Sequence, residues 1–248
     1  MKKYRLILDF GNTFQKVSIF SDNEILILKK FDGITLIKLK KFLSDYSDIS
    51  SCILSSVIET PIDIINWLNE SYFFIKLSHT TPIPIENKYG SPETLGKDRL
   101  AAAIGAYSFY QNQNVLSIDM GTAIKFDLVT NKGEYLGGSI SPGLYLRFKA
   151  LHTFTAKLPL VDYNNVHELI GTNTETSILS GVMNGAIGEI NAFIEEYKSH
   201  YSDLKIIISG GESIYFERYI KNHIFAVSNL VLIGLNEILI FNEQNYSI

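Results

Sequence analysis

The sequence has a single cysteine, Cys52, so an internal disulfide and a metal site built from clustered cysteines are both excluded. Cys52 lies in the apolar run Cys52-Ile53-Leu54, which is typical of a buried and unreactive thiol. The five histidines do not show the paired spacing of zinc ligands. A zinc enzyme is therefore not expected.

The sequence also has no large excess of either sign of charge. The formal net charge is −4, and charged residues make up 19% of the chain. A mildly acidic chain gains no general attraction to a phosphate backbone, so nucleic acid is not an expected partner. Anionic ligands would have to be bound by local geometry instead of by the overall field.

Long apolar runs are missing as well. Near the N-terminus the run Leu6-Ile7-Leu8 is too short for the core of a signal peptide, and Asp9 ends it. The longest apolar tract, residues 224–240, is too interrupted for a membrane span. The interrupting residues are Ser228, Asn229, Asn236 and Glu237. We therefore expect no membrane association and a cytoplasmic location.

What the chain does contain is an internal repeat. An apolar strand precedes Asp9-Phe10-Gly11-Asn12-Thr13, and another precedes Asp119-Met120-Gly121-Thr122-Ala123. A second strand pattern follows each segment, so each predicts a β-hairpin whose turn carries an acid, a glycine and a hydroxyl.

The surroundings of the two hairpins also match. Strands and helices alternate after each, which predicts a mixed sheet covered by helices. Two such halves, residues 1–112 and 113–248, imply a cleft between them. The expected elements are strands at Ile25–Leu28, Ile53–Val57, Tyr72–Leu77, Tyr135–Ile140 and Leu204–Ser209, and helices at Leu36–Leu43, Pro61–Asn69, Leu100–Tyr110, Gly143–Thr155 and Thr174–Tyr197.

The first hairpin offers the groups that bind a nucleotide phosphate. Gly11 allows close approach of the backbone, and successive turn N–H groups form an anion-binding concavity. Asn12 and Thr13 add neutral donors, and Lys16 adds a positive one if the turn directs it inward. Asp9 is suited to hold hydrated Mg²⁺. An ordinary turn explains one such segment equally well, but two equivalent copies favour function.

A glycine pair completes the pattern. Gly210-Gly211 follows the strand Leu204–Ser209, a corner against which an adenosine can lie. Two related halves, two phosphate hairpins and this pair resemble the superfamily of sugar kinases, actin and the heat-shock chaperone ATPases. The resemblance implies a duplicated ribonuclease H-like (actin-like ATPase) α/β fold, with two mixed-sheet halves, helices on both faces and ATP in the cleft between them.

The remaining motifs resemble one family of this superfamily, the type III pantothenate kinases. They keep that family's order over nearly the whole chain. They are Tyr89 with Gly96-Lys97-Asp98-Arg99, Asp119-Met120-Gly121-Thr122-Ala123 with Asp127, Gly137–Gly143, Thr155–Pro159, Gly171-Thr172-Asn173-Thr174 with Ser180-Gly181, and Asn229–Leu235.

This resemblance implies a homodimer that phosphorylates pantothenate with ATP, Mg²⁺ and a monovalent cation, K⁺ or NH₄⁺, as the first step toward coenzyme A. It also implies a role for each matching residue. Asp98 would be the proton acceptor; Asp9, Phe10, Gly11, Asn12, Thr13, Phe14, Gln15, Lys16 and Thr122 would bind ATP; Tyr89, Gly96, Lys97, Asp98, Arg99 and Thr174 would hold pantothenate; Asp119 would bind the monovalent cation, and Asp9 the Mg²⁺ through water.

Simpler roles compete for the same residues. Asp98 and Arg99 could form a surface ion pair or a cap at the start of a helix. Thr174 could be the N-cap of the long helix after it, Tyr89 a loop anchor, and Asp119 the acceptor of an Asx-turn. The strand position of Asp127 is compatible with solvent exposure.

Two other functions fit the motifs less well. A kinase for another sugar or polyol would be expected to carry a larger substrate domain or a cysteine cluster, and the sequence has neither. A nucleotide-binding regulatory protein of the same fold needs phosphate loops but no base for an alcohol. Asp98 beside Arg99 therefore favours a kinase.

Overall fold

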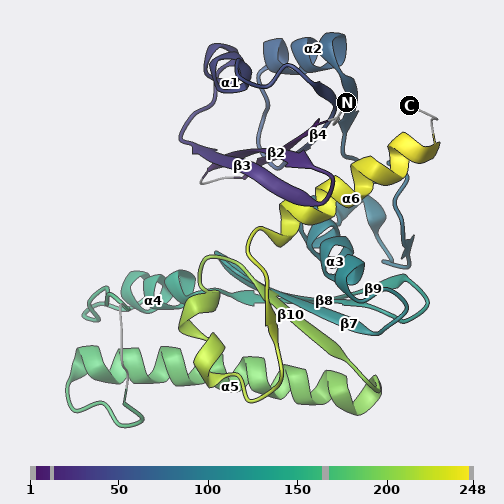
Figure 1. The fold of residues 1–248 in the computed structure, drawn as a ribbon. Coiled ribbons are helices and arrows are strands. Elements are labelled where there is room, and N and C mark those ends of the chain that lie inside the picture. Colours follow the sequence, from purple (N-terminus) through teal and green to yellow (C-terminus); the bar gives the residue numbers. More distant parts are fainter. Residues whose placement is uncertain (1–3, 12–13, 164–167, 246–248) are drawn as a thin grey trace. The chain divides into compact units, whose positions relative to one another are not determined.

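The computed structural model describes residues 4–11, 14–163 and 168–245, and the chain divides into two compact units (Figure 1). Unit 1 contains the described residues up to Phe109 together with those from Leu230 onward, and unit 2 is Tyr110–Asn229. The last helix, α6 (Leu230–Asn245), therefore groups with the N-terminal part of the chain. The sequence division after residue 112 places it with the second half.

Unit 1 is built on a mixed sheet in the order β3-β2-β1-β4-β5. The strands β1, β2 and β3 are antiparallel neighbours, whereas β4 and β5 run parallel to β1. Alternate residues of β1, among them Leu6 and Leu8, are fully buried in one core cluster. The five strands are β1 (Tyr4–Phe10), β2 (Gln15–Ser21), β3 (Glu24–Phe31), β4 (Ile49–Ser56) and β5 (Phe73–Lys76).

Helices cover both faces of this sheet. α1 (Leu36–Leu43) and α2 (Ile62–Ser71) bury one apolar stripe each against the Leu6 and Leu8 face. On the opposite face, α6 contacts β1 and β4 and packs closely along α3 (Lys97–Phe109) (Figure 1). Between β5 and α3 the chain forms the short strand β6 (Glu86–Asn87) and the 3₁₀ turn η1 (Pro92–Thr94).

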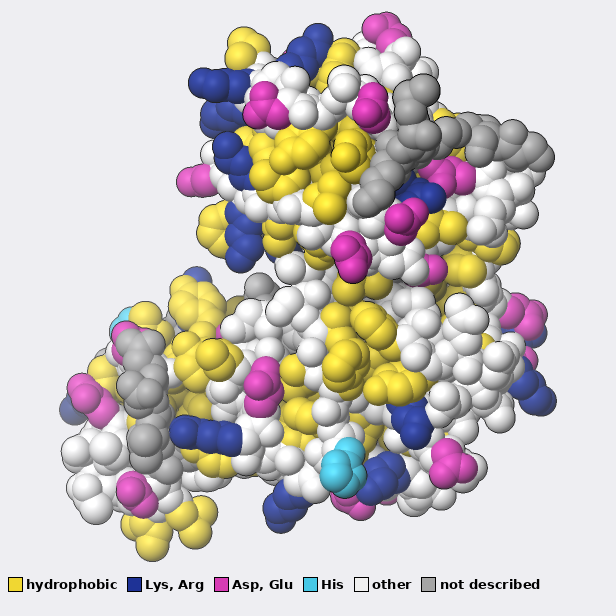
Figure 2. Space-filling model, viewed as in Figure 1, with side chains coloured by type: hydrophobic (Ala, Val, Ile, Leu, Met, Phe, Trp, Pro, Cys, Tyr) yellow, Lys and Arg dark blue, Asp and Glu magenta, His cyan; other side chains and the backbone are white. Residues whose placement is uncertain are grey.

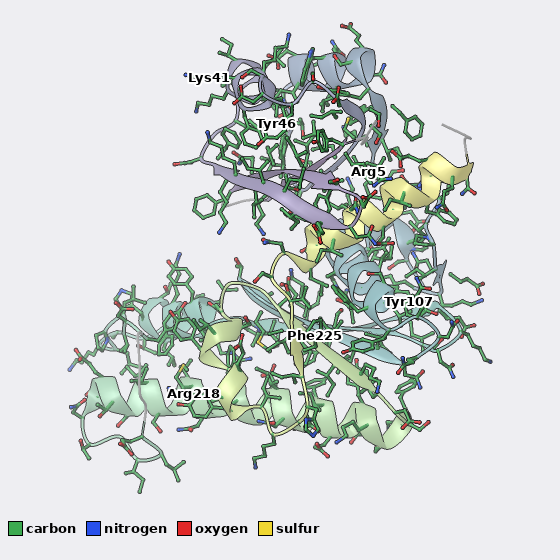
Figure 3. The ribbon with its side chains drawn as sticks, viewed as in Figure 1. Arg5, Lys41, Tyr46, Tyr107, Arg218 and Phe225 are labelled. Carbon is green, nitrogen blue, oxygen red and sulfur yellow. The ribbon has the colours of Figure 1, made fainter. Side chains whose placement is uncertain are left out.

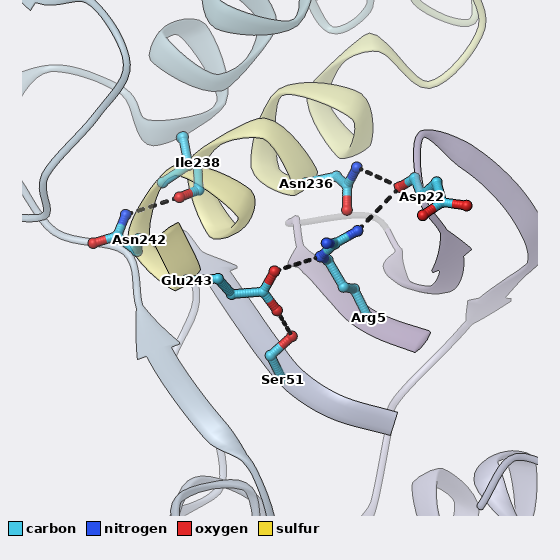
Figure 4. Close-up of polar contacts among 7 residues, drawn as sticks. All are labelled: Arg5, Asp22, Ser51, Asn236, Ile238, Asn242 and Glu243. Atoms are coloured by element: carbon cyan, nitrogen blue, oxygen red, sulfur yellow. Dashed lines mark hydrogen bonds and ion pairs between the residues drawn. The ribbon is translucent and has the colours of Figure 1, made fainter. Parts of the chain in front are cut away.

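Polar contacts fasten α6 to the sheet of unit 1 (Figure 4). Arg5 Nε of β1 donates to Glu243 Oε2 at 2.8 Å, and Ser51 of β4 donates to the other oxygen of the same carboxylate. Asn236 Nδ2 donates to the Asp22 carbonyl at 3.0 Å. The Arg5 side chain accordingly lies between the sheet and the helix in Figure 3.

Lys and Arg side chains gather at one edge of unit 1, over α1 and β3 (Figure 2). Two of them lie over aromatic rings: Lys29 Nζ is 5.1 Å from the Phe31 centroid, and Lys40 Nζ is 5.2 Å from that of Trp67. Packing on aromatic rings therefore accounts for the positions of two of these lysines. The two elements contribute Lys29, Lys30, Lys38, Lys40 and Lys41.

Unit 2 repeats the arrangement of unit 1. The five strands that lie in unit 2 follow the order β9-β8-β7-β10-β11, with β7, β8 and β9 antiparallel and with β10 and β11 parallel to β7. The order matches that of unit 1 strand for strand, so the expected duplicated fold of two mixed sheets is confirmed. The strands are β7 (Val115–Met120), β8 (Ala123–Val129), β9 (Glu134–Pro142), β10 (Lys205–Ser209) and β11 (Phe225–Ala226).

Two helices of unit 2 share one core cluster with its sheet. α4 (Leu144–Thr153) contributes Leu144 and Phe148, and α5 (Thr174–His200) contributes an apolar stripe from Ile178 to Ile194. Between β10 and β11 lie two 3₁₀ turns, η2 (Ser213–Tyr215) and η3 (Glu217–Tyr219). Within the described parts of both units, no helix combines the length and the apolar character needed to cross a membrane.

Candidate active site

A glycine N–H closes each of the two hairpin turns. In the β1–β2 turn, Gly11 N donates to Phe14 O at 3.1 Å, and in the β7–β8 turn Gly121 N donates to Ala123 O at 3.2 Å. A Cβ built on Gly121 would meet no atom within 4 Å, so the space beside this glycine is open to a ligand. Two of the expected phosphate contacts, Asn12 and Thr13, lie outside the described residues.

Each hairpin places a lysine directly opposite its aspartate. The register pairs Asp9 with Lys16 and Asp119 with Lys125. In unit 2 this pair is an ion pair, with 2.9 Å between Lys125 Nζ and Asp119 Oδ2 and with side chains 18% and 16% exposed. Lys125 was not among the residues singled out from the sequence, although the comparison of the two repeats aligns it close to Lys16.

The predicted glycine corner lies against the end of β7. Gly210 has φ +98°, and a Cβ there would lie 2.1 Å from Met120 O, so only glycine fits. Glu212 N donates to that same Met120 carbonyl at 3.0 Å. The corner and the β7–β8 turn are thus packed together, as adenosine and phosphate sites on one nucleotide would require.

Glu212 is a second residue that the sequence interpretation missed. Its carboxylate accepts hydrogen bonds from Leu144 N at 2.9 Å, at the start of α4, and from the Tyr163 hydroxyl at 3.0 Å. Burial and then the Glu212 carboxylate raise the pKa of Tyr163 above its usual value. Glu212 therefore joins α4 to the glycine corner.

Asp98 occupies the first turn of α3, where the helix dipole favours a carboxylate. The residue before the helix, Gly96, accepts from Leu100 N at 3.2 Å and so caps the backbone. A Cβ at Gly96 would lie 2.8 Å from Asp98 Oδ1. The Asp98 carboxylate thus folds back over Gly96, and the two predicted substrate residues depend on each other.

Arg99 and Tyr89 also come together, although a loop separates them in sequence. Arg99 is buried, with 6% of its surface exposed, and its guanidinium carbon lies 5.6 Å from the centroid of the Tyr89 ring. A guanidinium group can both stack on an aromatic ring and bind a carboxylate through two hydrogen bonds. This geometry does not fit the alternative in which Arg99 is a surface residue.

Lys97 lies on the other side of the same helical turn. Its ammonium donates to the Ser56 carbonyl, at the end of β4, at 3.3 Å. Burial and then the charge of Lys76 lower the pKa of Lys97. Lys97 also borders a pocket of about 240 Å³ in unit 1. The other residues that line the pocket are Leu77, Ser78, His79, Asn87, Pro92, Glu93, Leu95 and Leu100.

Two residues of unit 2, Thr174 and Asp127, do not have the simpler roles considered for them. The N-cap of α5 is Asn173, whose side chain accepts from Thr176 N at 2.9 Å in a capping box, so Thr174 is not the cap. Thr174 is the exposed first residue of the helix. Asp127 does not face solvent: it is 2% exposed and accepts from the Tyr135 hydroxyl at 2.7 Å.

Among the described residues, no three His, Cys, Asp or Glu side chains are grouped as a metal site. At the β1–β2 hairpin, the carboxylate that a divalent cation could use is that of Asp9, at the end of β1. Such a donor set fits Mg²⁺, which keeps several waters and relies on substrate phosphates for its other ligands.

Known solved structures share this fold at low sequence identity. A Baf family transcriptional activator from Campylobacter jejuni matches with a TM-score of 0.59 and 20% identity, over 98% of this chain and 100% of that one. A glucokinase from an Antarctic psychrotroph matches with a TM-score of 0.56 and 13% identity, over 97% of this chain and 100% of that one. These likenesses concern the fold alone.

Sequence relatives are more informative. A type III pantothenate kinase of Christiangramia forsetii is 46% identical over 96% of this chain and 98% of its own length. A type III pantothenate kinase of Flavobacterium johnsoniae is 38% identical over 94% of this chain and 96% of its own length. The family model for type III pantothenate kinase matches residues 5–196. Both hairpins and the first turn of α3 fall inside that match, and the chain belongs to the type III pantothenate kinase family.

Proposed function

We propose that this chain transfers the γ-phosphoryl group of ATP to pantothenate and forms 4'-phosphopantothenate, the first step of coenzyme A biosynthesis. The observation that carries the proposal is the cluster at the start of α3. There a carboxylate folded over Gly96 adjoins a buried guanidinium stacked on Tyr89. A nucleotide-binding protein that transfers nothing does not need this cluster, whereas an alcohol kinase does.

ATP binding is assigned to both hairpins. In the β1–β2 hairpin the segment Asp9–Lys16 would bind the phosphates, with backbone N–H groups at Gly11 and the Lys16 ammonium as donors. In the β7–β8 hairpin, Thr122 would add a hydroxyl. Asp9 would hold Mg²⁺, which neutralises phosphate charge when bound.

Asp98 is the proposed general base. The 4'-hydroxyl oxygen of pantothenate attacks the γ-phosphorus, the bond from that phosphorus to the β,γ-bridging oxygen breaks, and ADP leaves. The hydroxyl proton passes to the Asp98 carboxylate late in the step, because the transition state is loose. Phosphoryl transfer depends mainly on positioning, so a fixed orientation of this carboxylate matters more than its basicity.

Pantothenate binding is assigned to the residues around Asp98. The Arg99 guanidinium would bind the substrate carboxylate bidentately, and Lys97 would add a second positive charge beside the pocket of unit 1. Tyr89 would keep the guanidinium in place. Unpaired polar partners would then reject substrates that lack the carboxylate or the hydroxyl.

The proposal also includes a homodimer, with Thr174 reaching pantothenate from a second copy, and a cytoplasmic location. It does not include a monovalent cation at Asp119, because Lys125 Nζ already contacts that carboxylate at 2.9 Å. Analytical ultracentrifugation tests the dimer, and a Thr174→Ala variant with a raised KM for pantothenate and an unchanged KM for ATP would support the contact.

The reaction itself is tested by measuring ADP release from ATP and Mg²⁺ with and without pantothenate. The proposal predicts release that depends on pantothenate and saturates with it. Turnover that is the same without pantothenate would point to a regulatory nucleotide-binding protein. Turnover that appears only with a sugar or another polyol would reject pantothenate as the substrate.

A further inference from the structure

The carboxylate to which the family resemblance assigns a monovalent cation already carries a positive charge in this chain. Lys125 Nζ donates to Asp119 Oδ2 at 2.9 Å, and the two groups form an ion pair. Both side chains are mostly shielded from water, at 18% and 16% exposure. Solvent therefore screens this pair less than it would screen an exposed one.

The sheet fixes the backbone position from which this ammonium group reaches Asp119. Asp119 and Lys125 are register partners on the antiparallel strands β7 and β8, next to the turn that Gly121 closes. β8 is itself paired with β9 on its other side, where Lys125 lies opposite Ile140. The flanking residues Ile124 and Phe126 are fully buried. The strand therefore cannot shift Lys125 away without breaking the sheet.

The chemistry of the pair matches that of a bound monovalent cation. A lysine ammonium carries the same single positive charge as K⁺ or NH₄⁺, and here it donates to an oxygen of the carboxylate that is expected to bind such a cation. A free cation at Asp119 Oδ2 would have to displace this tethered group or lie close to its like charge in a largely shielded site. The residues present do not fit an added monovalent cation at that oxygen.

We infer that Lys125 acts as a built-in replacement for the monovalent cation, so that nucleotide binding and phosphoryl transfer by this chain do not require K⁺ or NH₄⁺. The inference rests on the proposed function, because it assumes that the β7–β8 hairpin binds ATP. It concerns a different property, the cation requirement, and can fail while pantothenate phosphorylation stands.

The wild-type protein provides the first test. MgATP binding is titrated by calorimetry in KCl and in tetramethylammonium chloride at equal ionic strength, and turnover with pantothenate is measured in the same buffers. We expect the dissociation constant and the turnover to agree within about twofold between the salts. A loss of about tenfold or more in tetramethylammonium that K⁺ or NH₄⁺ restores with saturation would overturn the inference.

The second test removes the ammonium. In Lys125→Met we expect MgATP affinity to fall by about tenfold or more in tetramethylammonium and to recover with K⁺ or NH₄⁺. Lys132→Met is the matched control, because it removes one exposed lysine from the turn after β8, and it should behave like the wild type. A folded Lys125→Met protein that stays indifferent to K⁺ and NH₄⁺ would overturn the inference. If this variant does not fold, the wild-type comparison decides.

The two proposals fail in different ways. MgATP binding that is indifferent to cations, together with no transfer to pantothenate, would reject the proposed function and leave the role of Lys125 in place. Transfer to pantothenate that requires K⁺ would support the proposed function and reject the role of Lys125. A chain that does not bind MgATP would overturn both.

Discussion

The Asp98 carboxylate occupies the space that a side chain at Gly96 would need. A Cβ at residue 96 would lie 2.8 Å from Asp98 Oδ1, closer than any relaxed contact, and the nearest Arg99 carbons would be 3.6 Å away. The strain would be relieved most easily by rotation of Asp98, because its carboxylate is the end of a flexible side chain. The absence of a side chain at Gly96 thus permits the observed direction of the proposed base.

Replacing Gly96 with alanine should therefore impair catalysis more than stability. We expect Gly96→Ala to lower kcat by roughly 10- to 100-fold, since small misplacements of a reacting group are costly. Its melting temperature should stay close to the wild-type value. Gly90→Ala is the control, because a Cβ there meets nothing within 4 Å. Equal kcat values for the two variants would refute the role of Gly96.

The ring of Tyr89 supports the Arg99 guanidinium at 5.6 Å. Removing the ring in Tyr89→Leu should raise the KM for pantothenate by roughly 2- to 30-fold, the equivalent of a cation–π contact of about 0.5–2 kcal/mol. The KM for ATP should change little. Tyr89→Phe keeps the ring and serves as the matched control. An increase of the same size in Tyr89→Phe would show that the hydroxyl, and not the ring, is what matters.

Helices α3 and α6 approach so closely that only glycine fits between them. A Cβ at Gly234 would lie 1.7 Å from the Ala101 carbonyl oxygen, and one at Gly105 would lie 2.5 Å from the Leu230 carbonyl oxygen. We expect Gly234→Ala to lower the free energy of unfolding by about 1–3 kcal/mol in urea titrations, because the helices must move apart. Gly185→Ala, at an open position on α5, should instead be neutral or stabilising.

Glu237 on α6 should make stability depend on pH. Burial raises the pKa of its carboxyl above the ordinary 4.5, against the opposing charge of Arg5. The folded state therefore binds this proton more tightly than the unfolded state does. The stabilisation is complete below pH 4.5 and is lost as pH rises through the raised pKa.

Glu237→Gln should remove this dependence. The free energy of unfolding of the variant, relative to the wild type, should rise with pH above 4.5 and then level off. Urea titrations at a series of pH values measure the difference. A difference that stays constant across the series would mean that Glu237 does not titrate as described.

Local patterns predicted most of the fold. α1 spans Leu36–Leu43 as expected, and the two Asp-x-Gly segments lie between paired antiparallel strands. Such features depend on neighbouring residues and on strand alternation. The grouping of α6 with unit 1 depends instead on close packing at Gly105 and Gly234, which lie far apart in sequence. A local sequence pattern does not predict a contact between residues so far apart in the chain.

Motifs in the sequence named the residues of the proposed site but not their contacts. Tyr89, Gly96, Asp98 and Arg99 were all named from motifs, and the structure brings them together in two interacting pairs. The Lys125 ion pair depends on strand register, which in turn depends on the length of the turn. The capping role of Asn173 in place of Thr174 reflects a helix boundary one residue away, finer than a sequence pattern defines.

The most direct test of the account measures the product itself. Wild-type protein and Asp98→Asn are incubated with ATP, Mg²⁺ and pantothenate, and 4'-phosphopantothenate is quantified by mass spectrometry beside ADP. We predict equal amounts of the two products for the wild type. For Asp98→Asn we predict a rate lower by roughly 100- to 10,000-fold, with MgATP affinity retained. ADP without phosphopantothenate, or an Asp98→Asn variant that works at the wild-type rate, would contradict the account.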